Sequence, residues 1–144
     1  MYPKARGIIV QTKKAYEITL KRFPNANIKI IGNPINNLIY NNICEREDII
    51  LTVGRLISSK HHDRLIRIFS KLNASGWKLV IVGGDALKEN NYEKLATLIK
   101  QSGLSSNIVL TGPQKDVISY YYKSKIFAFT SSVEGFPNVI IEAM

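Results

Sequence analysis

The order of apolar runs along this chain constrains its fold more than any other feature of the sequence. Four short runs are mostly apolar, and each is followed by a turn that contains glycine; they span residues 49–53, 77–82, 107–110 and 126–129. Strands that are apolar at consecutive positions are buried on both faces, which is typical of a parallel sheet between two layers of helices. The sequence therefore predicts an α/β fold, with a parallel sheet and helices on both faces.

Helical patterns separate these strands. We expect the first helix at residues 60–72, with Ser58 or Ser59 as its cap. Its apolar side chains recur at helical spacing and should form the buried side: Leu65, Ile66, Ile68, Phe69 and Leu72. Further helices are expected at 92–101 and 115–123.

The first part of the chain shows a smaller strand–helix–strand pattern. Residues 7–12 and 27–31 read as short strands on either side of a basic amphipathic helix at 13–23. The stretch that follows, residues 36–48, is irregular and polar. We therefore predict a linker there and a main domain at 49–144.

Each strand of the predicted sheet ends in a turn that carries glycine, at Gly54, Gly83-Gly84, Gly112 and Gly135. In parallel α/β sheets the carboxyl ends of the strands lie at one edge, and ligands bind there. Glycine also lets a ligand approach the backbone closely. We therefore expect these turns to line one binding site.

The last residues, 131–144, combine a loop with the start of a helix and hold two carboxylates. Asn138 is a candidate N-cap and Pro137 fits the first turn, so the free N–H groups of the helix would point back at the loop. Glu142 would lie about one turn into the helix and Glu134 on the loop before it, one on each side of a bound phosphate. Solvated glutamates near a helix start have the same spacing, and spacing alone favours that simpler interpretation.

Arg55 and Lys60 stand at the end of one strand and the start of the next helix. A cation near a helix N-terminus is disfavoured by the helix dipole, so a nearby anion such as a diphosphate would account for the pair. Two solvated surface charges are the alternative, and for an arbitrary Arg-x4-Lys pair that alternative is the more frequent one.

The composition narrows the classes of partner. The 144 residues carry a formal net charge of +9, which favours nucleotides, nucleic acid or acidic membranes. Basic residues are spread over several elements without an aromatic stacking platform, so nucleic-acid binding is not predicted. The single Cys44 excludes an intrachain disulfide, and the adjacent His61 and His62 cannot pair at i, i+4 on a helix, so no metal site is predicted.

The sequence also bears on location. No apolar run approaches the ~20 residues of a membrane span, and we expect a cytoplasmic protein. The basic helix at 13–23 could touch acidic lipid at the inner face of the membrane, although a solvated helix face is the simpler interpretation.

Two segments resemble one protein family. The phrase Glu134-Gly135-Phe136-Pro137-Asn138-Val139-Ile140-Ile141-Glu142-Ala143-Met144 resembles the E-x7-E signature of retaining glycosyltransferases of family 4, the glycosyl transferases group 1. Gly54-Arg55-Leu56 with Lys60 resembles the Gly-Arg-Leu…Lys segment of the same family, in the right order and at about the right distance. The resemblance implies a GT-B fold, in which two Rossmann-like domains enclose a cleft.

The resemblance also implies roles for these residues. Arg55 and Lys60 would bind the diphosphate of a nucleotide-sugar donor, and Glu134 would contact the transferred sugar near the reaction centre. Glu142 would accept hydrogen bonds from the ribose hydroxyls. The remaining donor-binding positions would be Gly54, Gly112, Gly135, Phe136, Pro137, Asn138 and Val139.

The implied reaction is the metal-independent transfer of a sugar, with retention at the anomeric carbon, from a nucleotide-diphosphate donor. UDP is the expected nucleotide, a glycan or lipid-linked molecule is the expected acceptor, and no cofactor is expected. Polysaccharide or glycoconjugate assembly is the corresponding biological role. The alternative is a non-catalytic Rossmann-like nucleotide-binding or interaction module.

The chain departs from the family's pattern in three ways. His61 follows the lysine where the family commonly has glycine, and Gly83-Gly84-Asp85 replaces its usual Gly-x-Gly-Pro turn. The chain is also short: the resemblance assigns residues 1–35 to the tail of an acceptor-side domain and 49–144 to a truncated donor-binding domain. We therefore interpret the chain as a fragment that binds a nucleotide-sugar weakly at best and does not turn it over by itself.

Overall fold

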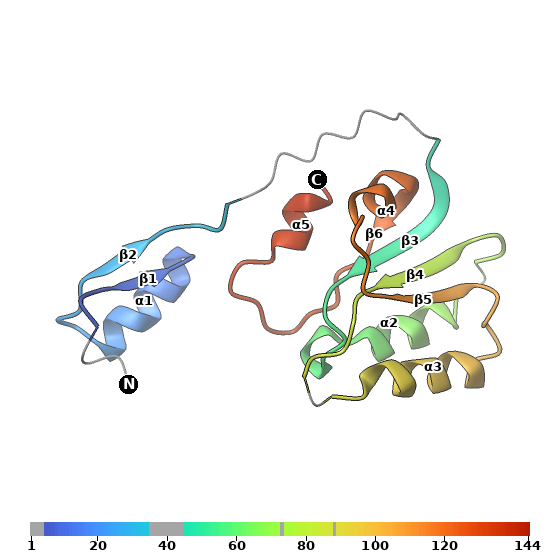
Figure 1. Ribbon diagram of the computed structural model, residues 1–144, viewed down its shortest axis with the longest axis horizontal. Helices are drawn as coiled ribbons and strands as arrows, with labels where there is room; N and C mark the ends of the chain where they lie inside the picture. The colour runs from blue at the N-terminus through green and yellow to red at the C-terminus, as the bar shows by residue number, and fades with distance from the viewer. Residues whose placement is uncertain (1–4, 35–44, 73, 88) are drawn as a thin grey trace.

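A computed structural model describes residues 5–34, 45–72, 74–87 and 89–144 of the chain (Figure 1). It contains two parallel sheets, one of two strands and one of four. The first unit consists of β1 Ile8–Val10, α1 Lys13–Arg22 and β2 Ile28–Ile30. The second unit consists of β3 Glu47–Val53, a 3-10 turn Ser58–Lys60, α2 His62–Phe69, β4 Lys78–Val82, α3 Asn91–Gln101, β5 Ile108–Gly112, α4 Ile118–Lys123, β6 Ser124–Phe127 and α5 Asn138–Glu142.

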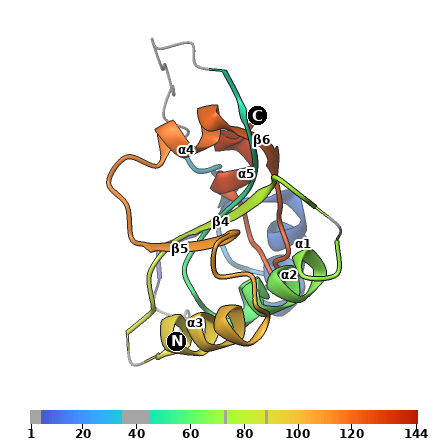
Figure 2. The same cartoon turned by 90° about the vertical axis from the view of Figure 1, so that its right-hand side faces the viewer.

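The four-stranded sheet confirms the predicted architecture. Its strand order is β5-β4-β3-β6, and every neighbouring pair runs parallel. Figures 1 and 2 show α2 and α3 together on one face of this sheet and α4 on the other. Parallel neighbours need a crossover connection, and helices in the crossovers cover the sheet faces.

Side chains along the central strands alternate between two cores. Leu79 and Ile81 of β4 face α2 and α3, whereas Val80 and Val82 of the same strand face the α4 side. The first core is completed by Leu65, Ile66, Phe69, Leu95, Ile99 and Ile108. The second is completed by Ile49 and Leu51, with Val117, Tyr120, Tyr121 and Phe127 packed against it. Burying each such aliphatic side chain stabilises the fold by about 1.5–3 kcal/mol.

The first helix of this unit begins later than its pattern predicts. Ser58–Lys60 forms a 3-10 turn, His61 adopts a left-handed conformation, and α2 starts at His62 without a side-chain cap. The predicted caps at Ser58 and Ser59 are therefore wrong. The predicted helix at 60–72 is interrupted at His61, because a residue in the left-handed conformation cannot continue a right-handed helix.

The buried face of α2 is also narrower than predicted. Leu65, Ile66 and Phe69 are buried as expected, but Ile68 and Leu72 are 47% and 52% exposed. Ile68 lies beside the buried stripe, and Leu72 lies beyond the last helical residue, Phe69.

Within the described residues, β6 forms one edge of the four-stranded sheet and pairs with β3 alone. Ile126 is 46% exposed, so the prediction of a fully buried strand at 126–129 is wrong for this residue. An edge strand lacks a neighbour on one side, and apolar sequence alone does not show which strand takes that place. β3 begins at Glu47, so the last two residues of the predicted linker at 36–48 belong to this strand. Residues 36–44 of that linker, which include Cys44, lie outside the described ranges.

The N-terminal unit confirms the predicted strand–helix–strand pattern. β1 and β2 pair in parallel, and α1 connects them. The Thr12 hydroxyl caps α1 by accepting a hydrogen bond from the Ala15 N–H at 3.1 Å. Ile18 and Leu20 on this basic helix are exposed, so α1 covers its small sheet with only part of its apolar face.

The turns after β3 and β4 approach so closely that one of them requires glycine. A Cβ atom on Gly83 would lie 1.8 Å from the carbonyl oxygen of Gly54. The Gly54 N–H donates to the Val82 carbonyl at 2.9 Å, and the Leu56 N–H donates to the Gly84 carbonyl at 2.9 Å. The β3–β4 ladder therefore continues into both turns and fixes them to each other.

Replacing Gly83 by alanine should destabilise the fold strongly, because the added Cβ would collide with the Gly54 carbonyl and separate β3 from β4. We expect a loss of about 3 kcal/mol or more in the free energy of unfolding, measured by urea denaturation. Gly32→Ala is the matched control, since a Cβ there meets no atom within 4 Å. Equal stability of the two variants would contradict the contact.

Candidate functional site

Two charged side chains pair at the carboxyl edge of the four-stranded sheet, and a third, Arg55, extends from the neighbouring turn after β3. Lys60 of the 3-10 turn forms an ion pair with Glu134 of the β6–α5 loop, and the two side chains are only 17% and 23% exposed. The Lys60 ammonium also lies 5.8 Å from the centre of the Phe129 ring. Arg55, from the turn after β3, is close enough to act on the Glu134 carboxylate. The structure therefore brings together three of the predicted site residues from distant parts of the sequence.

Two opposing influences set the pKa of Glu134. Burial raises it, but hydrogen bonds from Lys60 and Ser131 and the positive charges of Lys60 and Arg55 outweigh burial and lower the pKa below its usual value. Glu134 is therefore a carboxylate at neutral pH. In that form it can stabilise positive charge, and it has no proton to donate.

The β6–α5 loop is fastened to the 3-10 turn by hydrogen bonds. The Thr130 hydroxyl donates to the Lys60 carbonyl at 2.7 Å, and the Ser132 N–H donates to the Ser59 carbonyl at 2.9 Å. The Nε2 atom of His61 lies 2.9 Å from the Ser132 Oγ. These bonds flank the ion pair in sequence, so they hold its two partners at a fixed separation.

The second predicted carboxylate, Glu142, is the last residue of α5 and is held by Tyr121. The Tyr121 hydroxyl donates to Glu142 Oε2 at 2.9 Å. Burial raises the pKa of the Tyr121 phenol, and the hydrogen bond and negative charge of Glu142 raise it further, so the phenol stays protonated as the donor. The Tyr121 ring packs 5.6 Å from the Phe127 ring, which ties α4 to β6. Glu142 is thereby oriented, with Oε1 left to accept from another group.

Asn138 does not cap α5, contrary to the prediction. Its side-chain oxygen accepts a hydrogen bond from Asn33 Nδ2 at 3.0 Å, and Asn33 in turn accepts one from Gln11 of the N-terminal unit. Pro137 precedes the helix without any side-chain cap. The amide of Asn138 is thus used for a contact with a residue 105 positions away, which local sequence reasoning does not anticipate.

The rest of the predicted loop lies between the ion pair and α5. Phe136 and Pro137 are half-buried on the loop, and Val139 is half-buried in the first turn of α5. Gly135 borders a pocket of about 450 Å³ that it shares with the N-terminal unit, including Gln11 and Asn33. The loop therefore faces the N-terminal unit, as Figure 1 also shows for α5.

The glycine turns after the other strands meet at the same edge. The Gly83 N–H donates to the Gly112 carbonyl at 3.1 Å, and Gly112 has a φ of 71°, which glycine adopts readily. A Cβ on Gly54 would lie 3.7 Å from the Lys60 side chain. Asp85 has a structural role instead, because its Oδ1 accepts at 2.9 Å from the first two N–H groups of α3.

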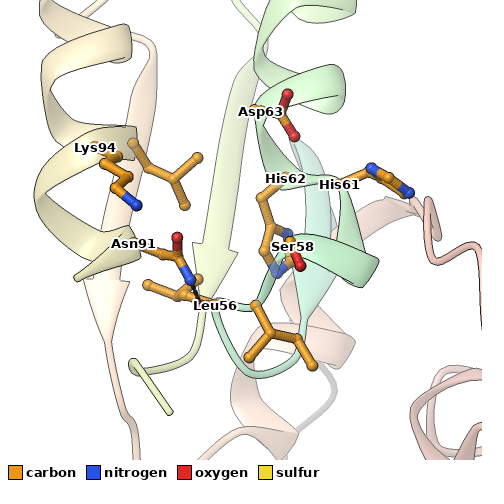
Figure 3. A pocket seen from close by; sticks show the side chains of 9 residues that line it. Leu56, Ser58, His61, His62, Asp63, Asn91 and Lys94 are labelled. Atoms are coloured by element: carbon orange, nitrogen blue, oxygen red, sulfur yellow. Dashed lines mark hydrogen bonds between the residues drawn. The ribbon is translucent and has the colours of Figure 1, made fainter. Parts of the chain in front are cut away.

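A separate hollow of about 340 Å³ lies between α2 and α3, lined in part by His62, Asp63, Asn91 and Lys94 (Figure 3). His62 is 4% exposed, and its Nε2 lies 3.3 Å from the Arg55 carbonyl. Burial lowers the pKa of His62 although the hydrogen bond to Arg55 opposes this, so the imidazole is neutral at pH 7. His62 therefore stabilises the position of the Arg55 backbone through this hydrogen bond.

Sequence reasoning missed three partners of the site: Tyr121, Asn33 and the hydroxyl groups of residues 130–132. The sequence offered one signal for these partners, which is the run of hydroxyl side chains just before Glu134.

In the ranges that the structure describes, no cluster of three or more His, Cys, Asp or Glu side chains could hold a metal ion. None of the helices in those ranges has the length and apolar character to span a bilayer.

Two curated proteins are similar to nearly the whole chain. The amylovoran biosynthesis glycosyltransferase AmsD of Erwinia amylovora is 32% identical, over 99% of this chain and 41% of its own length. The N-acetylgalactosamine-N,N'-diacetylbacillosaminyl-diphospho-undecaprenol 4-alpha-N-acetylgalactosaminyltransferase of Campylobacter jejuni is 34% identical, over 100% of this chain and 40% of its own length. The chain therefore spans about 40% of the length of these relatives.

Solved glycosyltransferase structures share the fold. A TarM variant of S. aureus, solved with UDP among its ligands, has a TM-score of 0.81 at 26% identity and is matched over 96% of this chain and 28% of its own. HepE of Anabaena, solved with UDP and glucose, has a TM-score of 0.83 at 20% identity, over 96% of this chain and 42% of its own. These likenesses confirm the α/β architecture of GT-B glycosyltransferases that the sequence predicted.

The family assignment rests on the second unit and on the length of the similarity. Residues 37–144 match the family described as Glycosyl transferases group 1. This range includes both segments that carry the charged cluster. The relatives that are at least 30% identical extend the similarity over nearly all of the chain. The chain belongs to the glycosyl transferases group 1 family.

Proposed function

We propose that this chain supplies the donor-binding part of a retaining glycosyltransferase that uses a UDP-sugar. The observation that carries the proposal is the Lys60–Glu134 ion pair at the carboxyl edge of the sheet, with the cation of Arg55 on the adjoining turn. Ligands of parallel α/β sheets bind at that edge. The family membership and the UDP bound to the similar TarM variant add support.

The two cations suit a diphosphate. Arg55 can bind phosphate oxygens with its planar fork, and the Lys60 ammonium has three N–H donors. Lys60 can therefore hold Glu134 and a phosphate oxygen at the same time. Gly54 and Gly112, in turns at the same edge, have no side chain between the backbone and the rest of the nucleotide.

The reaction that we propose uses this charge distribution. The bond between the anomeric carbon and the diphosphate oxygen breaks with its electron pair on the diphosphate, where Arg55 and Lys60 stabilise the added negative charge. The oxygen of an acceptor hydroxyl bonds to the same face of that carbon, and its proton passes to the departing diphosphate oxygen, which carries the electron pair of the broken bond. Glu134, as a carboxylate beside the sugar, stabilises the positive charge that develops on the ring during the transfer.

Glu142 completes the donor site in this proposal. Tyr121 fixes one of its carboxylate oxygens, so the other is oriented before a ligand arrives. A carboxylate oxygen accepts hydrogen bonds from the hydroxyls of a ribose. The backbone of residues 135–139 would hold the sugar and phosphate beside it.

The acceptor side is assigned to the N-terminal unit. We propose that residues 1–35 belong to the tail of an acceptor-side domain, that residues 36–48 link the two parts, and that residues 49–144 belong to the donor-binding domain. A glycan or lipid-linked acceptor is supported by the relatives, one of which is named for amylovoran biosynthesis and another for a diphospho-undecaprenol substrate. The same relatives support a role in polysaccharide or glycoconjugate assembly. We further propose that the chain acts in the cytoplasm, at the inner face of the membrane.

UDP binding tests the donor site directly. Isothermal calorimetry of the 144-residue chain at low salt should show saturable UDP binding. Arg55→Ala, Lys60→Ala and Glu142→Ala should each weaken it about tenfold or more, since each removes a charged hydrogen-bonding partner.

Lys71→Ala is the matched control for Arg55→Ala and Lys60→Ala, because this exposed lysine lies beyond the end of α2 and its removal changes the net charge by the same amount. If all three site variants bound UDP as tightly as the parent chain, the site would have to be abandoned. A folded parent chain that binds none of UDP, GDP or ADP would contradict the proposal.

The ion pair gives the chain a defined pH dependence. Because the pKa of Glu134 in the folded chain lies below 4.5, its ionised form stabilises the fold above that pH, and the stabilisation is lost as the pH falls through the lowered pKa. The melting temperature of the parent chain should exceed that of Glu134→Gln at neutral pH, and the difference should disappear on acidification. A difference that stays constant down to low pH would argue against the pair.

The basic helix α1 supports a peripheral contact with anionic membrane. It carries Lys13, Lys14, Lys21 and Arg22 together with the exposed Ile18 and Leu20. Co-sedimentation with vesicles should increase with the fraction of anionic lipid and fall for Lys13→Gln/Lys14→Gln. Sedimentation that is indifferent to anionic lipid would end this part of the proposal.

A further inference from the structure

One backbone conformation beside the charged cluster is unusual. His61 has φ 52° and ψ 41°, and among the described residues it is the single non-glycine residue with a positive φ. This left-handed region is unfavourable for residues with a Cβ atom. Such a conformation persists only where the surrounding structure enforces it, and it is most informative when it adjoins a functional site.

The His61 side chain shows what its surroundings provide. Figure 3 shows the ring directed away from the hollow between α2 and α3, whereas His62 next to it is buried. The ring nitrogen Nε2 lies 2.9 Å from the Ser132 Oγ. The Ser132 Oγ also lies 3.3 Å from the Ser59 carbonyl, to which its hydroxyl can donate, and with that orientation it accepts from His61 protonated on Nε2.

This bond joins the two segments that hold the ion pair. Lys60 directly precedes His61, and Glu134 lies two residues after Ser132. The Ser132 N–H also donates to the Ser59 carbonyl at 2.9 Å. The imidazole therefore closes a small ring of hydrogen bonds between the 3-10 turn and the β6–α5 loop.

We propose that His61 is a positioning residue: it accepts an unfavourable backbone conformation so that its ring clamps Ser132 and holds Glu134 beside Lys60. The imidazole itself touches neither charged partner in the contacts described, and acts through the loop. This inference rests on the proposed donor site, because it makes the affinity for UDP depend on the His61 ring. It also makes a claim about the loop that does not require UDP.

Two variants separate the ring from the backbone. His61→Ala loses the ring but keeps a Cβ in the left-handed conformation, whereas His61→Gly loses the ring and relieves the backbone. Calorimetry should show UDP binding weakened by a similar factor in both variants, roughly 3- to 10-fold, as for the loss of one hydrogen bond. The glycine variant should nevertheless melt roughly 3–6 °C above the alanine variant.

A purely structural histidine would give a different result. UDP affinity would then follow stability, so that His61→Gly would bind UDP as tightly as the parent chain and only His61→Ala would bind more weakly. That outcome would overturn the proposal. Ser132→Ala should weaken UDP binding at least as much as His61→Ala, because it also removes the contact of the hydroxyl with the Ser59 carbonyl. The double variant should bind UDP no more weakly than Ser132→Ala alone, because both changes break the bond between His61 and Ser132. Fully additive losses would also overturn it.

Hydrogen exchange distinguishes failure of the clamp from failure of the donor site. If the folded parent chain did not bind UDP, the proposed function would fail for this chain, while the clamp would still predict faster exchange of the amides at 130–134 in both His61 variants. The N–H of Ser132 is the most direct reporter, since it donates to Ser59. Exchange rates in this loop equal to those of the parent chain would refute the clamp, whatever the result with UDP.

Discussion

Burial of β3 and β4 in the middle of the sheet is the constraint on which the rest of the structure depends. Their alternate side chains fill two separate cores, so neither strand can shift by one residue without exchanging one set for the other. The register fixed in this way continues past the strand ends, where the Gly54 and Gly83 turns touch. The positions of Arg55 and Lys60 therefore follow largely from packing far from the site, and hydrogen bonds to their backbone carbonyls from His62 and Thr130 add local support.

The features that the sequence predicted are those written in local patterns. Near-continuous apolar strands indicated a parallel sheet, and a glycine after each strand located the edge at which the charged residues meet. The predictions that proved wrong have a common physical cause: each concerns a residue whose environment is set by partners distant in the sequence. Asn138 was expected to cap α5, but it binds Asn33, and Ile126 was expected to be buried, but its strand lies at the sheet edge. The orientation of Glu142 by Tyr121 is likewise a tertiary contact between α4 and α5 that no spacing rule contains.

The charged cluster is arranged for a ligand that adds negative charge. Glu134 neutralises one of the two nearby cations, so a positive charge remains in a chain whose formal net charge is +9. A diphosphate would meet this excess without having to displace the carboxylate, because Lys60 can donate in more than one direction. The excess of positive charge also acts on Glu134. It lowers the pKa of this carboxyl group, so that the carboxylate stays ionised although burial opposes its charge.

The loop that carries Glu134 is held unequally on its two sides. On the side of the four-stranded sheet, an ion pair and several hydrogen bonds tie it to residues 58–61. On the side of the N-terminal unit, the connection runs through neutral amides, from Gln11 through Asn33 to Asn138. A neutral hydrogen bond contributes only about 0.5–1.5 kcal/mol, and partial exposure to water lowers that contribution. The geometry of the charged cluster is therefore set mainly by the ion pair and hydrogen bonds within the second unit, and the amide contact with the N-terminal unit contributes less to it.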